Sequence, residues 1–147
     1  MSSGLFQEMT TRDLTGVKDS VLAGLEEVVH GFGINRVRIV PDAQGGVWIE
    51  ISDVELGPPY AQDLTFAICL LPFNLPAADI YPLFVRHDLS RLDGRELGQG
   101  FQVITLQWPG DSVPRTVAQV SRRTRGALTL QTPRQKIDKV LDWVRSQ

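Results

Sequence analysis

The chain has 147 residues, 42% hydrophobic and 22% charged, a composition typical of one globular domain with a single core. Its net charge of −2 gives no basic excess for nucleic-acid phosphates, and no apolar run approaches the roughly 20 residues of a membrane helix. Its one cysteine excludes an internal disulfide and fits a reducing compartment. With no signal peptide visible, we expect a cytoplasmic protein that binds neither nucleic acid nor membrane.

The pattern of the first 30 residues or so predicts a helix. Residues 1–10 have no periodic pattern and are expected to be a loose lead-in to a domain that spans residues 1–147. From about Thr11 to His30, apolar residues recur at helical spacing, which predicts one buried stripe: Leu14, Val17, Val21, Leu25, Val28 and Phe32. His30 falls near the expected C-terminal end of the helix, where the helix dipole would stabilise its charged form, so we interpret it as a capping residue. The glycines that follow it are typical of a helix end.

Four strands are predicted next. Alternating patterns over residues 36–40 and 47–52 flank a turn at 41–46, which predicts a hairpin. Residues 64–71 predict a third strand, with Leu64, Phe66, Ile68 and Leu70 expected on its inward face and Thr65, Ala67, Cys69 and Leu71 on the other. After a proline-interrupted crossing, residues 81–86 predict a fourth strand, which completes an antiparallel meander.

The second half has a less regular pattern. Residues 87–100 are polar and glycine-bearing, which favours a long irregular loop, and residues 101–108 are strand-like. Residues 113–126 carry little periodicity. Thr132, Pro133 and Gln135 form a capping box with proline at the first helical position, and they predict a C-terminal helix. Its expected apolar face consists of Ile137, Val140, Leu141 and Val144. The predicted fold class is therefore α+β.

This order of elements, with residues 66–72 (FAICLLP) and 80–82 (IYP), resembles the ubiquitin-conjugating enzyme (UBC) superfamily, which includes noncatalytic variants and RWD domains. The two stretches look like the family's third strand, which ends in proline, and its Tyr-Pro element. Residues 119–123 (QVSRR) are similar to a segment of a bacterial UBC-like branch. Members of that branch are encoded beside activating enzymes, ubiquitin-like modifiers and deconjugating proteases.

The chain departs from the family where the catalytic residues are expected. Catalytic members have His-Pro-Asn after the fourth strand and a cysteine shortly beyond, whereas here His87 is followed by Asp88 and Leu89 and no cysteine follows. Thioester chemistry needs an accessible thiolate. The resemblance therefore implies a UBC-like fold without the usual nucleophile.

Three residues are weak catalytic candidates. Cys69 is either a displaced nucleophile or a small buried strand residue, and its apolar neighbours favour the second interpretation. His87 and Asp88 could orient a proton transfer, but adjacent strand residues point to opposite faces. The two histidines and one cysteine are scattered, so we expect neither a metal site nor a cofactor.

Partner-binding candidates lie later in the chain and on the second strand. Four arginines fall within eleven residues: Arg115, Arg122, Arg123 and Arg125, with Ser121 between them. This segment is either a docking surface for an acidic partner or carboxylate tail, or a solvated edge. Trp48 alternates outward from Ile49, so it either marks an interface or packs under the element that covers that face.

The resulting hypothesis is a UBC-like component of a bacterial ubiquitin-like conjugation system. Its expected role is a noncatalytic adaptor that binds the activating enzyme, the modifier or a conjugating subunit. One alternative is an active transferase that uses Cys69 or an unusual nucleophile. Another is a structural adaptor or chaperone-like dimer unrelated to modifiers.

Overall fold

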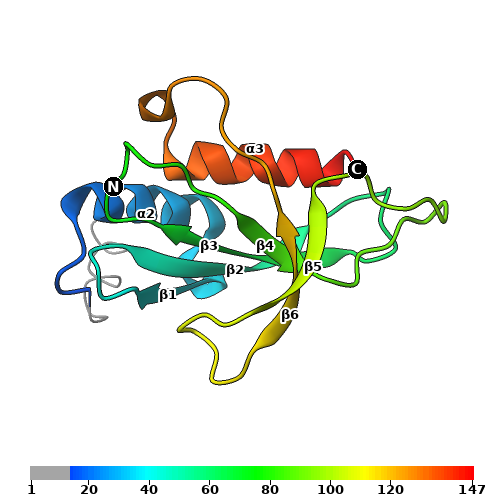
Figure 1. The fold of residues 1–147 in the computed structure, drawn as a ribbon, viewed down its shortest axis with the longest axis horizontal. Coiled ribbons are helices and arrows are strands. Elements are labelled where there is room, and N and C mark those ends of the chain that lie inside the picture. Colours follow the sequence, from blue (N-terminus) through cyan, green and yellow to red (C-terminus); the bar gives the residue numbers. More distant parts are fainter. Residues whose placement is uncertain (1–13) are drawn as a thin grey trace.

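The computed structural model describes residues 14–147, so the predicted lead-in at residues 1–10 lies outside the described part. Two helices and a six-stranded antiparallel sheet form an α+β fold (Figure 1). The helices are α2 (Asp19–Phe32) and α3 (Pro133–Arg145), with short 3-10 turns at Ile34–Arg36 and Leu128–Leu130. The strands are β1 (Val37–Pro41), β2 (Val47–Glu55), β3 (Leu64–Leu71), β4 (Leu83–Arg86), β5 (Phe101–Leu106) and β6 (Arg115–Val120).

The predicted four-stranded meander is not confirmed, because the sheet has six strands in the order β1-β2-β3-β4-β6-β5. The hairpin of β5 and β6 extends the sheet beyond β4, with Leu83 of β4 opposite Val120 of β6. Sequence reasoning left residues 113–126 without an element, yet they contain β6. The reason is that two consecutive residues, Val117 and Ala118, are both buried, so the strand lacks a regular alternation.

Helix α2 begins eight residues later than predicted, at Asp19. Leu14 and Val17 are buried as expected, but they lie in a turn ahead of the helix. The turn includes Gly16, whose φ of +87° suits a residue without a side chain. Lys18 N then donates to Gly45 O over 2.9 Å, which ties the start of the helix to the β1–β2 turn.

The prediction for α3 is confirmed. Thr132 is its N-cap and forms the full capping box with Gln135. The predicted apolar face is buried, with Leu141 1% exposed. α3 lies close to α2 because Gly24 of α2 faces Pro133, where an added Cβ would come within 2.5 Å of the proline Cγ.

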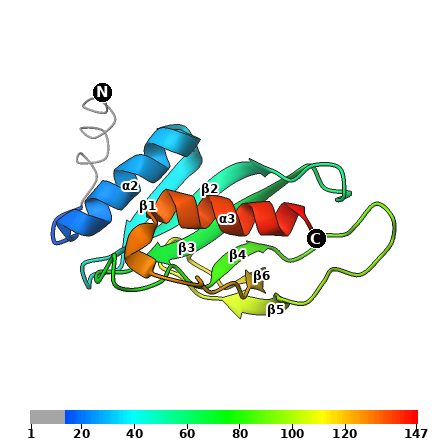
Figure 2. The same cartoon turned by 90° about the horizontal axis from the view of Figure 1, so that it is seen from above.

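The two faces of the sheet carry different cores. α2 and α3 cover one face (Figure 2), where they pack on Ala67, Cys69 and Leu71 of β3. On the opposite face, Ile68 of β3 packs with Trp108 in a smaller cluster, against which Phe66 also packs. The predicted inward face of β3 is therefore wrong: the residues that pack in the helix-side core are Ala67, Cys69 and Leu71. Both sides of this strand are apolar, so alternation alone could not identify the main core.

Candidate functional site

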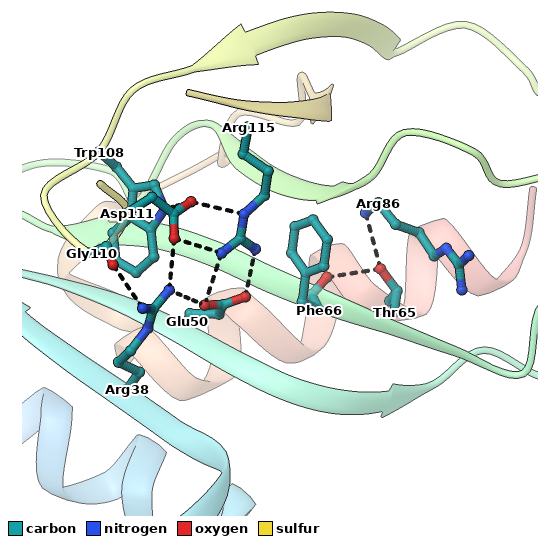
Figure 3. Close-up of polar contacts among 9 residues, drawn as sticks. All are labelled: Arg38, Glu50, Thr65, Phe66, Arg86, Trp108, Gly110, Asp111 and Arg115. Carbon is teal, nitrogen blue, oxygen red and sulfur yellow. Dashed lines mark hydrogen bonds and ion pairs between the residues drawn. The ribbon is translucent and has the colours of Figure 1, made fainter. Parts of the chain in front are cut away.

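The face of the sheet opposite the helices is closed by an ion-pair network around Glu50 (Figure 3). Arg115 on β6 reaches Glu50 on β2 with Nη1–Oε2 at 2.6 Å, although β3 and β4 separate those strands in the sheet. Arg38 on β1 contacts Glu50 at 2.5 Å and Asp111 at 3.1 Å. Asp111 also accepts hydrogen bonds from Arg115 and from the indole nitrogen of Trp108. The sheet must therefore curl so that the start of β6 approaches β2.

This network binds the charge of one partner-binding candidate, Arg115, and a second candidate, Trp48, packs beside it. Hydrogen bonds from Arg115, opposed by partial burial and supported by those from Trp108 and Arg38, lower the pKa of Asp111 to about 2. The carboxylate is therefore ionised and bound at neutral pH. Trp48 packs against the Trp108 ring with centroids 6.1 Å apart and is only partly exposed. Arg115 and Trp48 thus hold the curled sheet together and lie on the face opposite the helices.

Cys69 is fully buried on β3, beneath the helices. Burial raises the pKa of its thiol to about 12, so almost no thiolate exists at neutral pH. The side chain behaves as a small apolar core residue. This placement argues against the alternative in which Cys69 receives a modifier from an activating enzyme.

We predict that Cys69 reacts slowly with a thiol reagent in the folded protein and rapidly in denaturant. The rate of thionitrobenzoate release from Ellman's reagent, measured with and without urea, checks this. Cys69→Ser should keep partner binding and lose about 1–3 kcal/mol of stability, because the replacement has nearly the same size but buries a hydroxyl in an apolar core. A fast native reaction would contradict the buried position.

The other two catalytic candidates are His87 and Asp88, and Arg86 binds the carboxylate of Asp88. Both side chains are exposed just after β4. Asp88 accepts two hydrogen bonds from Arg86, at 2.6 and 2.7 Å, and these chiefly lower its pKa to about 2. A carboxylate so held is a weak base at neutral pH. Ser121, the remaining candidate, lies at the end of β6 and receives a long hydrogen bond of 3.4 Å from Gln119.

The three other candidate arginines line a groove of about 240 Å³ between residues 122–125 and α3, which we call the basic groove. Its cations are Arg122, Arg123, Arg125, Lys136 and Lys139, and its other lining residues are Thr124, Gln131, Val140 and Trp143. No carboxylate lines it. The sequence predicted three of these arginines as a cluster, whereas the two lysines join them only because α3 packs alongside.

Aromatic rings hold two of the arginines in place. The Arg122 guanidinium lies 4.8 Å from the centre of the Trp143 ring, and Trp143 in turn stacks on Phe101. The Arg123 guanidinium lies 3.9 Å from the Tyr81 ring. Cation–π contacts of this kind position a guanidinium while its N–H groups can still bind an anion.

A buried ion pair anchors the backbone of the same segment. Lys136 is 4% exposed, and its Nζ donates to Arg122 O at 2.8 Å and to Thr124 Oγ1 at 2.9 Å. Asp79 accepts from Thr124 N and Oγ1, both at 2.7 Å, and lies 3.3 Å from Lys136 Nζ. Sequence reasoning missed both residues, because 57 positions separate them.

The groove arginines differ from most of the other arginines in their partners. Elsewhere in residues 14–147, seven arginines form ion pairs with carboxylates: Arg38, Arg86, Arg91, Arg95, Arg115, Arg134 and Arg145. Within the same residues, Arg122, Arg123 and Arg125 form none, and all three are exposed. Three exposed cations without counter-charges on an anchored segment can bind an anionic ligand without first breaking an ion pair.

A second pocket adjoins the groove. It has a volume of about 320 Å³ and lies between α2, the 75–80 crossing and the start of α3. Leu75, Ile80 and Pro133 contribute to its largely apolar wall. Lys136 and Gln131 line both this pocket and the basic groove. The two hollows therefore share a wall.

Comparisons of the chain with known protein families, curated proteins and solved structures give no match. Among residues 14–147, no helix combines the length and the apolar character needed to cross a membrane. No group of three or more potential metal ligands comes together in this described part. We therefore identify the candidate site from the geometry of this chain, and the basic groove is the feature on which we base it.

Proposed function

We propose that the protein is a noncatalytic, UBC-like adaptor of a bacterial ubiquitin-like conjugation system, and that the basic groove binds an acidic segment or carboxylate tail of its protein partner. The observation that carries this proposal is the set of three unpaired arginines, Arg122, Arg123 and Arg125, on a segment anchored by Lys136. Guanidinium groups bind carboxylates in bidentate fashion, which suits a peptide carboxylate. The expected partners are the activating enzyme, the modifier or a conjugating subunit.

The buried Cys69 supports an adaptor over a transferase. A thioester on Cys69 would require opening the core between β3 and the helices, since the side chain is 0% exposed. The order of elements, with a helix before the sheet and a helix after it, supports the UBC-like assignment.

We predict that Arg122→Glu with Arg123→Glu abolishes partner binding and leaves the melting temperature nearly unchanged. Both side chains are exposed, so their reversal should repel an acidic partner without disturbing the core. Isothermal titration calorimetry with a bacterial activating enzyme and a ubiquitin-like modifier as the candidate partners measures binding. Binding of the parent should weaken with salt, because exposed charges are screened within about 10 Å at 0.1 M.

The matched control is Arg95→Glu with Arg134→Glu, which makes the same charge change outside the groove. These arginines form only long contacts to carboxylates, at 3.8 and 3.6 Å. Equal loss of binding in both double variants would mean that net charge, not the groove, governs the interaction. A reducible modifier adduct formed with activating enzyme and ATP, and lost in Cys69→Ser, would replace the adaptor with the transferase.

A further inference from the structure

The strand β5 forms one edge of the sheet and has none of the features that usually protect an edge. It is the last strand in the sheet order, and Figure 2 shows no labelled element beyond it. Its sequence, FQVITL, contains no charge and no proline. Natural edge strands are commonly protected by charged residues, proline or a bulge, because their unpaired backbone groups would otherwise bind another strand.

The opposite edge of the same sheet is protected. β1 contains Arg38, which is held by Glu50, and it ends at Pro41. Arg36, just before β1, donates to the carbonyl oxygens of Ser52 and Asp53 across the strand pair. Of the two edge strands of this sheet, β5 is therefore the one that is open to pairing with another strand.

The hydrogen bonds of the β5–β6 hairpin determine which backbone groups of β5 face outward. Ser121 N donates to Gly100 O over 2.9 Å, so Gly100 and Ser121 are a hydrogen-bonded pair. Because bonding directions alternate along an antiparallel pair, Gln102 and Ile104 bond toward β6. Phe101, Val103 and Thr105 then direct their N–H and C=O groups outward. Within residues 14–147 these three form no backbone hydrogen bond outside the β5–β6 pair.

This phase makes the edge complementary to itself. Two copies of β5 can pair antiparallel about a two-fold axis at Val103, so that Phe101 faces Thr105 of the second copy and Val103 faces its own counterpart. All outward groups of these three residues are then satisfied. Val103 is 61% exposed, the largest exposed fraction of any apolar side chain within a strand, and the axis would bring two such valines together.

We propose that β5 is a homodimerisation edge through which two copies of this chain join their sheets into one continuous sheet. A second copy fits better than a charged partner strand, because β5 offers no charge to select one and its bonding phase is symmetric about Val103. A two-fold axis through an antiparallel strand pair is perpendicular to the sheet. The helices of both copies, and both basic grooves, therefore lie on the same side of the joined sheet.

The test uses the fact that a residue on a two-fold axis meets itself. The parent protein should show twice the mass of one chain in size-exclusion chromatography with light scattering. Val103→Lys alone and Val103→Glu alone should each be monomeric, because like charges would face each other across the axis. A mixture of the two variants should recover a heterodimer. Because Val103 is exposed within one chain, the variants should keep the parent's circular dichroism spectrum, whereas the melting temperature of the dimeric parent alone should rise with protein concentration.

The control is Val113→Lys, at an exposed apolar residue in the β5–β6 loop, which should leave the dimer intact. The proposal is overturned if the parent is monomeric at the highest concentration at which it stays soluble. It is then overturned even if β5 binds a strand of another protein. It is also overturned if Val103→Lys remains dimeric, or if mixing the two charge variants fails to restore the dimer.

Discussion

Replacing Trp108 by alanine is expected to lower the free energy of unfolding by about 3–5 kcal/mol, the range for buried tryptophan truncations. Trp108 is 1% exposed and fills the cluster on the helix-free face of the sheet. Its indole nitrogen donates to Asp111 over 2.8 Å, and Arg38 lies 4.7 Å from its ring centre. The substitution would remove both the packing and a donor that holds Asp111 in the ion-pair network.

Urea denaturation followed by far-ultraviolet circular dichroism measures this loss independently of tryptophan fluorescence. The matched control is Trp48→Ala, which removes the neighbouring ring that is already partly exposed. It should cost distinctly less, because less area returns to water. Equal losses for the two variants would mean that Trp108 does not organise this face of the sheet.

Breaking the ion pair between Lys136 and Asp79 is expected to cost about 3 kcal/mol, the lower end of the range for removing one partner of a buried pair. Their side chains are 5% and 13% exposed. Asp79→Ala would leave a buried ammonium without its counter-charge, and Lys136→Met would remove the anchor of Arg122 O and Thr124. The double replacement should cost less than the sum of the single ones, since the pair is lost only once.

Lys139→Met is the matched control for Lys136→Met, because Lys139 is exposed on the same helix. It should change the urea midpoint little. If Lys136→Met is as mild as Lys139→Met, the buried lysine does not anchor the arginine segment. Partner binding offers a second readout, because a loosened segment should weaken binding even though Arg122 and Arg123 remain.

The pH dependence of the free energy of unfolding shows whether the Asp79 carboxylate stabilises the fold. Burial alone would raise the pKa of Asp79, but hydrogen bonds from Thr124 and the charge of Lys136 lower it below its ordinary value. A depressed carboxyl pKa stabilises the fold above the unfolded pKa of about 3.9, and this stability is lost as pH falls through the folded pKa. The stability of Asp79→Asn should therefore fall less steeply with acid than that of the parent.

Local patterns predicted the helices well. The Thr132 capping box and the apolar face of α3 depend on neighbours within a few residues, and both are present. The predicted stripe is buried from Leu14 to Val28 and partly buried at Phe32, although the helix itself starts at Asp19 because Lys18 is bound to the β1–β2 turn. Short-range periodicity reports which side chains are buried more reliably than it reports where an element begins.

Long-range pairing could not be predicted from the sequence. Arg115 was grouped with Arg122 by proximity in sequence, but β6 separates them by its length, roughly 20 Å at 3.3 Å per residue. The network that Arg115 joins requires Glu50, which lies 65 positions away. Trp108 continues the alternation of Ile104 and Leu106 in the stretch predicted to be strand-like, and all three pack in the cluster on the helix-free face. The sequence did not show that Arg38 and Asp111 would meet the Trp108 ring there.

The burial of Cys69 has a practical consequence for spectroscopy. The chain contains one cysteine, and its thiol, with a pKa of about 12, is almost wholly protonated and inaccessible in the native state. A cysteine introduced on the surface would then be the one fast-reacting thiol of the folded chain. Dyes and spin labels could be attached there by brief exposure to maleimide or methanethiosulfonate reagents, without first constructing a cysteine-free background.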